Sequence, residues 1–171
     1  RRQKHWPQPT GMQASTGHRV DKGSRVLSPM EQEDRQKFII ELDDELLKGG
    51  VVLSEWCVVM VREADIAFVA GANLATIVIA MAGVETYLRS EHGGESRVTL
   101  HKLIEYSPLE ERLKVDLQNL RKYRNKWVHM SVPCDDDDLL DHPELYDCDL
   151  ETTAIAAVRA FRQTIYENQW I

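Results

Sequence analysis

The sequence predicts an all-α protein, an antiparallel helical bundle of about five to six helices. Apolar residues recur at three- and four-residue spacing along much of the chain, and no segment of useful length shows β-type alternation. With 171 residues, 43% of them hydrophobic, the chain can bury a core. We expect one helical domain over residues 28–171, preceded by a flexible basic arm over residues 1–27 that lacks apolar periodicity.

Three helices are expected in the first half of the domain. Ser28-Pro29-Met30-Glu31 is a typical helix start, because the Ser hydroxyl can cap the first turn and Pro is tolerated there, and Gly49-Gly50 would end this helix. Helices are also predicted over residues 54–70 and 72–91, and they are antiparallel if Gly71 forms a turn. The third helix contains small residues that allow neighbours to approach closely: Ala72, Ala75, Ala80, Ala82 and Gly83.

The second half should contain three further helices. A short one is predicted over residues 99–106, and a longer one from Ser107-Pro108 to about Met130, with two acidic residues in its first turn. An acidic connection over residues 133–149 should precede a last helix over residues 150–170. Residues 135–151 hold nine acidic residues and no Lys or Arg, so without them the net charge of −7 would be +2.

A basic cluster lies in the helix that is predicted to end near Met130. Residues 112–126 contain six Lys and Arg residues, with Asp116 as the one acid. Such a cluster can attract phosphate groups, because Lys and Arg bound to a polyanion release its counterions. A helix face in solvent is an equally good interpretation of the charges alone.

The cysteines indicate the redox compartment and whether zinc can bind, and the longest uncharged segment raises the question of a membrane span. Cys57, Cys134 and Cys148 show neither CxxC spacing nor an even number, which is typical of reduced thiols in a cytoplasmic protein. Zinc could be bound by His129 with two of these thiols, but the acidic spacer lacks the usual ligand spacing, and we expect no metal and no cofactor. Residues 66–84 carry no charge, yet Gly, Asn and Thr interrupt this Ala-rich run, so we prefer a central bundle helix to a membrane span.

The candidate site residues follow the apolar stripe of the helix that is predicted to end near Met130. Arg124 falls on this stripe, and a guanidinium there must be paired or face a polar cavity, because an unpaired buried charge is strongly unfavourable. An ion pair with Glu85 is the structural alternative. The stripe consists of Leu113, Leu117, Leu120, Arg124, Trp127 and Ser131.

A neighbouring face of the same helix carries Arg121, Asn125 and His129 at four-residue spacing. Arg124 and His129 lie about 140° apart around a regular helix and about 7.5 Å apart along it, so one helix cannot aim both at the same atom. Fraying of the last turn near Pro133, or a second copy of the helix across a twofold axis, could place such groups around one phosphate.

These residues resemble the signature of the HEPN superfamily, which has Arg, a polar residue, at least three further positions and then His near a helix end. The match is Arg124-Asn125-x3-His129, and residues 64–71 and 84–89 resemble the first two core helices of the family. The resemblance spans about residues 52–170. It implies metal-independent RNA cleavage through attack of a ribose 2′-hydroxyl on the adjacent phosphate, and a homodimer with two copies of the motif in one cleft.

The resemblance also implies roles for individual residues. His129 would act as general base or acid, because imidazole titrates near neutral pH, Arg124 would stabilise the charge of the transition state, and Asn125 would orient His129 or the phosphate. A role in toxin–antitoxin systems or antiviral defence, with an antitoxin or regulatory protein as partner, is implied by analogy. In toxin members silenced by nucleotidyltransferases a Tyr follows the His after one residue, and here that position is Ser131. Candidate substrate-binding residues are Arg121, Lys126 and Tyr123.

Structural alternatives stand beside these roles. His129 can cap the helix C-terminus, where a cation is favoured by the dipole, and Asn125 can face solvent. Trp127 can belong to the core rather than stack on a base. Glu85 is a candidate supporting residue, although an ion pair with Arg89, one turn later, is its default partner. Under these alternatives the chain is a catalytically silent HEPN-like module that binds nucleotide or RNA, or a dimeric scaffold.

Overall fold

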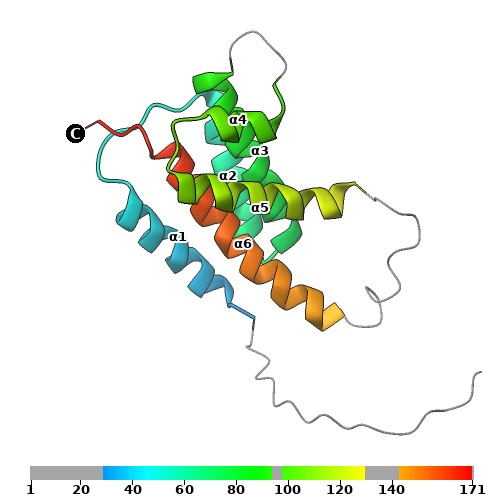
Figure 1. Cartoon of the computed structure of the whole chain (residues 1–171). Helices are drawn as coiled ribbons and strands as arrows, with labels where there is room; N and C mark the ends of the chain where they lie inside the picture. Colours follow the sequence, from blue (N-terminus) through cyan, green and yellow to red (C-terminus); the bar gives the residue numbers. More distant parts are fainter. Residues whose placement is uncertain (1–28, 94–97, 130–142, 171) are drawn as a thin grey trace, which may run out of the picture.

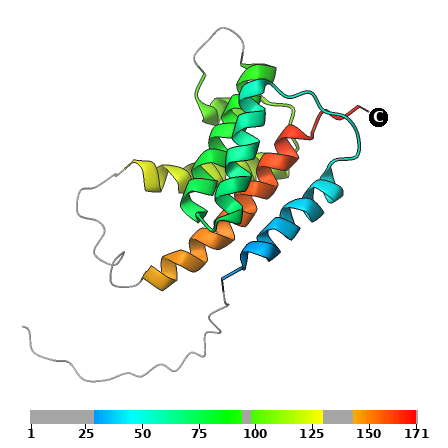
Figure 2. The ribbon, with the colours of Figure 1, turned by 180° about the vertical axis from the view of Figure 1, so that it is seen from behind.

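The computed structural model describes residues 29–93, 98–129 and 143–170, and its six helices confirm the predicted all-α class. The basic arm predicted over residues 1–27 lies outside these ranges. Figure 1 shows α5 lying across α3 and α6, and Figure 2 shows α2 on the opposite face of the molecule. The helices are α1 (Gln32–Leu46), α2 (Glu55–Val69), α3 (Asn73–His92), α4 (Leu100–Tyr106), α5 (Glu111–Val128) and α6 (Pro143–Ile165).

Helices α2 and α3 form the hairpin that the sequence predicts. The Ser54 hydroxyl accepts a hydrogen bond from the Cys57 N–H at 3.3 Å and so caps α2. Gly71 then adopts a φ of 74°, a left-handed conformation that is unfavourable for residues with a Cβ atom. The predicted turn at Gly71 is therefore confirmed, and it brings α3 back along α2.

Helix α3 is the central helix, in contact with α2, α4, α5 and α6. Helix α6 approaches it closely at Gly83, because a Cβ atom there would lie 2.2 Å from the Phe161 ring. Ala80 is fully buried on the same helix, whereas Ala72 and Ala75 are exposed and do not mediate close packing. The absence of charge in residues 76–84 thus fits burial in the bundle, whereas residues 70–72 at the turn are exposed. No helix in the described ranges is long and apolar enough to span a membrane.

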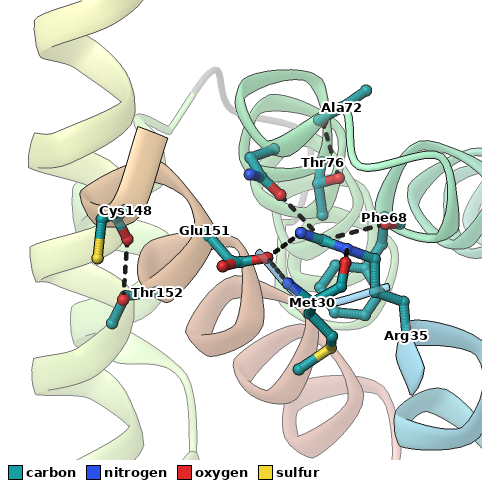
Figure 3. Close-up of polar contacts among 9 residues, drawn as sticks. Met30, Arg35, Phe68, Ala72, Thr76, Cys148, Glu151 and Thr152 are labelled. Carbon is teal, nitrogen blue, oxygen red and sulfur yellow. Dashed lines mark hydrogen bonds and ion pairs between the residues drawn. The ribbon is translucent and has the colours of Figure 1, made fainter. Parts of the chain in front are cut away.

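A buried arginine joins one end of α1 to three other helices. Arg35 is 3% exposed, and its guanidinium donates to the Phe68 carbonyl at 3.2 Å and to the Asn73 side chain at 3.0 Å. It also pairs with the carboxylate of Glu151 on α6 (Figure 3). The Arg35 Nε donates to the Met30 carbonyl at 3.0 Å, while the Met30 N–H donates to Glu151 at 2.9 Å. This network holds the N-terminus of α1 between α2 and α6.

A second buried arginine joins the middle of the bundle. Arg162 of α6 is 1% exposed, and its guanidinium donates to Asp43 of α1 at 2.7 Å and to both oxygens of Asp65 of α2 at 2.9 Å. The Tyr166 hydroxyl donates to Asp43 at 2.9 Å. Burial lowers the pKa of Arg162, but the attraction of Asp65 and Asp43 outweighs it and the net shift is upward. The guanidinium therefore stays charged in the core.

The start of α1 differs from the prediction. The helix begins at Gln32 with Glu31 as its N-cap, and Pro29 and Met30 are not helical. Ser28, the predicted cap, lies outside the described residues. The backbone polar groups of Met30 are engaged by Glu151 and Arg35, so contacts with distant helices replace the expected capping arrangement.

The start of α5 was also predicted too early. Ser107 is buried, is the C-cap of α4, and donates its hydroxyl to the Ile104 carbonyl at 2.8 Å. The chain then runs in non-helical conformation through a buried Leu109 before α5 begins at Glu111. Ser107-Pro108 therefore ends one helix and does not start the next.

Helix α6 begins seven residues earlier than predicted and ends five residues earlier. It runs over Pro143–Ile165, so residues 143–149 of the predicted acidic connection are helical, while residues 130–142 lie outside the described ranges. Pro143 at the first helical position and Glu144 in the first turn are both favourable at a helix N-terminus. The high density of acidic residues in this segment therefore does not indicate a connection between helices.

Residues after Ile165 turn back towards the α1–α2 connection. Gly50 and Trp170 form an isolated antiparallel bridge, with N–H···O distances of 2.9 and 3.1 Å. A Cβ atom on Gly50 would lie 2.6 Å from the Trp170 ring, and one on Gly49 would lie 2.3 Å from the Trp170 carbonyl oxygen. Helix α1 ends at Leu46 with Leu47 as its C-cap, earlier than the predicted end at Gly49-Gly50, and the two glycines instead admit the C-terminal segment.

We expect Asp65→Ala to destabilise the protein by about 3 kcal/mol, because it leaves the buried charge of Arg162 with only one carboxylate partner. The measurement is urea unfolding followed by circular dichroism. The matched control is Arg159→Ala, three residues earlier on α6, whose ion pair with Glu45 is 39% and 56% exposed and should contribute about 1 kcal/mol or less. Equal losses for the two variants would contradict the central role of the buried network.

Candidate functional site

The predicted site residues lie at the end of α5, where its apolar stripe leaves the core. Leu113, Leu117 and Leu120 are buried, as the stripe predicts, and anchor the helix against its neighbours. Arg124 and Trp127 continue the stripe but are only half-buried. The last turn and a half of α5 thus extends beyond the centre of the bundle, in a position to contact a ligand.

Two side chains of this segment have buried donor groups without an acceptor. The Nε of Arg124 and the Nε1 of Trp127 are inaccessible to solvent, and neither makes a hydrogen bond of good geometry within the described residues, although the indole N–H is close enough to the Tyr123 hydroxyl to have a lowering effect on its pKa. Buried donors are normally satisfied, so such groups call for a specific explanation. Both are donors only, so the group that would satisfy them is an acceptor such as a phosphate or carboxylate oxygen.

His129 is the C-cap residue of α5 rather than part of its last turn. Its N–H donates to the Asn125 carbonyl at 2.9 Å, but its φ of −131° and ψ of 100° are those of extended backbone. The predicted helix end near Met130 therefore moves to Val128. His129 is exposed and no longer follows the helical path, so the separation of about 140° from Arg124 that applies to a regular helix does not apply to it. Asn125 is half-buried.

An aromatic cluster, formed by Tyr123, Trp127 and Tyr146, joins α5 to the start of α6. The Trp127 ring lies 6.3 Å from that of Tyr123 and 6.1 Å from that of Tyr146, the latter edge to face at 88°. The Lys126 ammonium lies 5.7 Å from the Trp127 ring and 6.0 Å from the Tyr146 ring. The Tyr123 hydroxyl donates to Asp149 at 2.6 Å. Burial, followed by this hydrogen bond, raises the pKa of Tyr123 and keeps the phenol protonated.

Arg121 is held on the α4 side of α5. Its Nε donates to the Gln118 side chain at 2.8 Å, and the Gln118 amide donates to the His101 carbonyl of α4 at 2.9 Å. This chain of hydrogen bonds positions a half-buried guanidinium one turn before the predicted catalytic residues. Arg121 remains a candidate residue for contact with a phosphate.

Glu85 is engaged elsewhere. Its carboxylate accepts hydrogen bonds from Arg89 Nη2 at 2.6 Å and Nε at 3.2 Å, which is the default pairing expected from the sequence. The alternative ion pair between Glu85 and Arg124 is not formed. Glu85 on α3 therefore has a structural partner, and its supporting role is a prediction without geometric support.

A pocket of about 370 Å³ opens between α5 and α6, on the core side of the aromatic cluster. Tyr123 lines the pocket and also belongs to the aromatic cluster. Apolar side chains, uncharged polar ones and one charged residue of each sign line it. The lining residues are Asp116, Asn119, Leu120, Tyr123, Thr152, Thr153, Ala156, Arg159, Ala160 and Gln163.

Sequence reasoning missed the contribution of α6, because residues 143–149 were assigned to a connection. Tyr146 and Asp149 come from this part of the helix and complete the surroundings of Tyr123 and Trp127. Pro143 followed by Glu144 was the available signal for a helix start. A correct helix start alone does not predict that Tyr146 lies next to α5, because that contact depends on how the two helices pack.

In the part of the chain that the structure describes, no group of three His, Cys, Asp or Glu side chains could hold a metal ion. Cys57 is buried and Cys148 is exposed, both as free thiols. Cys134, the other thiol of the zinc alternative, lies outside the described residues. Comparison of the chain with protein-family models, with curated proteins and with solved structures gives no match.

We expect Tyr123→Phe to loosen the start of α6, because it removes the hydroxyl that donates to Asp149. Amides of residues 143–150 should exchange hydrogen several-fold faster in mass spectrometry, while the free energy of unfolding changes by about 1 kcal/mol or less. Tyr166→Phe is the control, because it removes a hydroxyl bonded to Asp43 at the other end of α6. Unchanged exchange at residues 143–150 in Tyr123→Phe would show that the bond does not hold the helix start.

Proposed function

We propose that the protein is a metal-independent endoribonuclease of the HEPN type, with Arg124, His129 and Asn125 as its catalytic residues. The observation that carries the proposal is the buried Nε of Arg124, which has no acceptor within the described part of the chain. This guanidinium lies five residues before an exposed imidazole at the end of a basic helix. A phosphate is the acceptor that suits both the unsatisfied donor and the surrounding charge.

The proposed reaction requires two proton transfers and charge stabilisation. The 2′-oxygen loses its proton to a general base and bonds to phosphorus, while the P–O5′ bond breaks and the leaving oxygen gains a proton from a general acid. His129 takes one of these roles, and Arg124 stabilises the negative charge on the phosphorane-like transition state. Since each chain supplies one His129, a homodimer would provide both the base and the acid, as the resemblance implies.

The neighbouring residues suit the binding of an RNA strand. Arg121 and Lys126 are the candidate phosphate contacts, and Tyr123 lines the pocket between α5 and α6. Aromatic rings beside basic side chains can stack on bases while the cations contact the backbone. A cytoplasmic toxin or antiviral-defence protein with an antitoxin or regulatory partner is the biological setting that belongs to this proposal by analogy.

A second candidate is a catalytically silent module that binds RNA or nucleotide. The observation that favours it is that no hydrogen bond within the described residues orients the His129 imidazole, whereas a catalytic histidine is usually held in a defined orientation. In that case the basic end of α5 and the aromatic cluster would bind RNA without turnover.

The test is cleavage of RNA in EDTA with analysis of the product ends. Wild-type protein should leave 2′,3′-cyclic phosphates, and Arg124→Ala and His129→Ala should each lower the rate at least about 100-fold without changing the helical circular dichroism spectrum. Lys122→Ala is the matched control, because it removes an exposed charge from the same helix and should retain most of the activity.

Three outcomes separate the alternatives. Cleavage that needs Mg²⁺, or that survives both substitutions, would contradict the mechanism. RNA retained on a filter with no cleavage would favour the silent module. If His129→Ala chains lower the activity of wild-type chains when the two are mixed, because a mixed dimer holds a single imidazole, one site is built from two chains; unchanged wild-type activity would contradict the composite site.

A further inference from the structure

The pocket between α5 and α6 has the size and the walls of a site for a small planar group. Its volume of about 370 Å³ falls in the range of about 300–1,000 Å³ that is typical of ligand pockets. Leu120 and Ala160 are buried and supply apolar walls, and Ala156 contributes only a methyl group to the lining. Tyr123 adds an aromatic ring, on which a flat ring can stack.

Three polar side chains of the pocket have no partner within the part of the chain that the structure describes. They are Asp116 and Asn119 of α5 and Gln163 of α6, and all three residues are exposed. None of these side chains forms a hydrogen bond or an ion pair with another described residue. Each amide offers donors and an acceptor, whereas the carboxylate offers acceptors only. A ligand that suits all three therefore carries an amino group next to an acceptor.

The cation that lines the pocket is already paired, and the unpaired donor lies beside the pocket. Arg159 donates from its guanidinium to Glu45 of α1 at 2.8 Å. Arg124 follows Leu120 by one turn on the same face of α5, about 6 Å along the helix, and its Nε is the buried donor without an acceptor. A phosphate is therefore expected at Arg124, and the uncharged part of the same nucleotide chain in the pocket.

The polar groups distinguish among the four bases of RNA. Adenine presents an N7 acceptor beside its N6 amino group, the pattern with which the amide of Asn or Gln pairs. The second amino hydrogen is then left for a carboxylate such as that of Asp116. Guanine presents two acceptors at this edge, which Arg or Lys matches best, and cytosine has the amino group without N7. Uracil presents a carbonyl oxygen in place of the amino group, which a carboxylate repels. Adenine is the best match.

We propose that the pocket between α5 and α6 binds an adenine base of an RNA strand whose phosphate lies at Arg124. The amides of Asn119 and Gln163 and the carboxylate of Asp116 contact the hydrogen-bonding edge of the base, and Tyr123 contacts its ring. This inference rests on the proposed RNA substrate, but it does not require that the strand be cleaved. It makes the protein selective for adenine next to the phosphate that Arg124 binds.

The test is the affinity of the protein for fluorescent 2′-O-methyl hexanucleotides, measured by anisotropy in EDTA at one salt concentration. These strands lack the 2′-hydroxyl nucleophile, so binding is measured without cleavage. The wild-type protein should bind oligoadenylate at least about 10-fold more tightly than oligouridylate. Replacing adenine by purine, which lacks the amino group, should remove most of this difference. Equal affinities for the three strands would overturn the proposal.

Variants separate recognition of the base from recognition of the phosphate. Ala156→Leu fills the pocket from an exposed position and should lower the affinity for oligoadenylate to that for oligouridylate. Ala75→Leu, at an exposed alanine of α3, is the matched control and should leave both affinities unchanged. Asn119→Leu combined with Gln163→Leu should act like Ala156→Leu without changing the helical circular dichroism spectrum. Arg124→Ala should lower both affinities by a similar factor, because a phosphate contact does not depend on the base.

The outcomes distinguish this inference from the proposed function. An adenine preference that survives in Ala156→Leu and in the double amide variant would place recognition outside the pocket and overturn the inference. Displacement of oligoadenylate by equimolar adenosine 5′-monophosphate would show a site for a free nucleotide and overturn the proposed occupant. RNA cleavage with no adenine preference would contradict this inference alone. Adenine-selective binding without cleavage would support it and contradict the nuclease, and no binding of any strand would overturn both.

Discussion

The arrangement of α1, α2 and α6 depends on the burial of the Arg162 guanidinium. A buried charge is tolerated only where carboxylates surround it, and here Asp43 and Asp65 come from two different helices. Apolar contacts allow helices to slide over one another, whereas this pairing has a required geometry. Arg35 imposes a similar requirement at the other end of α1, so two charged contacts fix the position of a helix with only two buried apolar side chains, Ile39 and Leu42.

Much of the fold was predictable because its signals are local. The Ser54 cap and the turn at Gly71 are encoded in a few neighbouring residues, and both were placed correctly. The errors at the starts of α1 and α5 have another origin, since they depend on tertiary contacts of Met30 and Ser107. Periodicity cannot predict such contacts. The early start of α6 at Pro143 did have a local signal, which the acidic composition obscured.

Arg35 and Arg162 are buried more deeply than Arg124, although neither lies in the basic cluster at the end of α5. A guanidinium on an apolar stripe must find a partner or a polar cavity, and Arg162 and Arg35 meet this requirement through carboxylates inside the fold. Both Arg124 and Arg162 have one buried nitrogen without an acceptor among the described residues, but Arg124 differs because no carboxylate in this part of the chain pairs with its guanidinium. The sequence could locate a basic, partly apolar helix end, but it could not distinguish a structural arginine from one that faces a ligand. The sequence also does not predict that Tyr146 and Asp149 of α6 contact Trp127 and Tyr123 of α5.

The ion pairs that position α1 join residues far apart in the chain. Arg35 and Glu151 are 116 residues apart, and Asp43 and Arg162 are 119 residues apart. During synthesis, Asp43 and Asp65 therefore leave the ribosome long before Arg162, the residue with which they pair. Contacts of such sequence separation slow folding, because the entropy of closing a long loop must be overcome before they form. The α2–α3 hairpin, joined by a tight turn, consists of contacts that are local in sequence, whereas the ion pairs between α1 and α6 require the last helix.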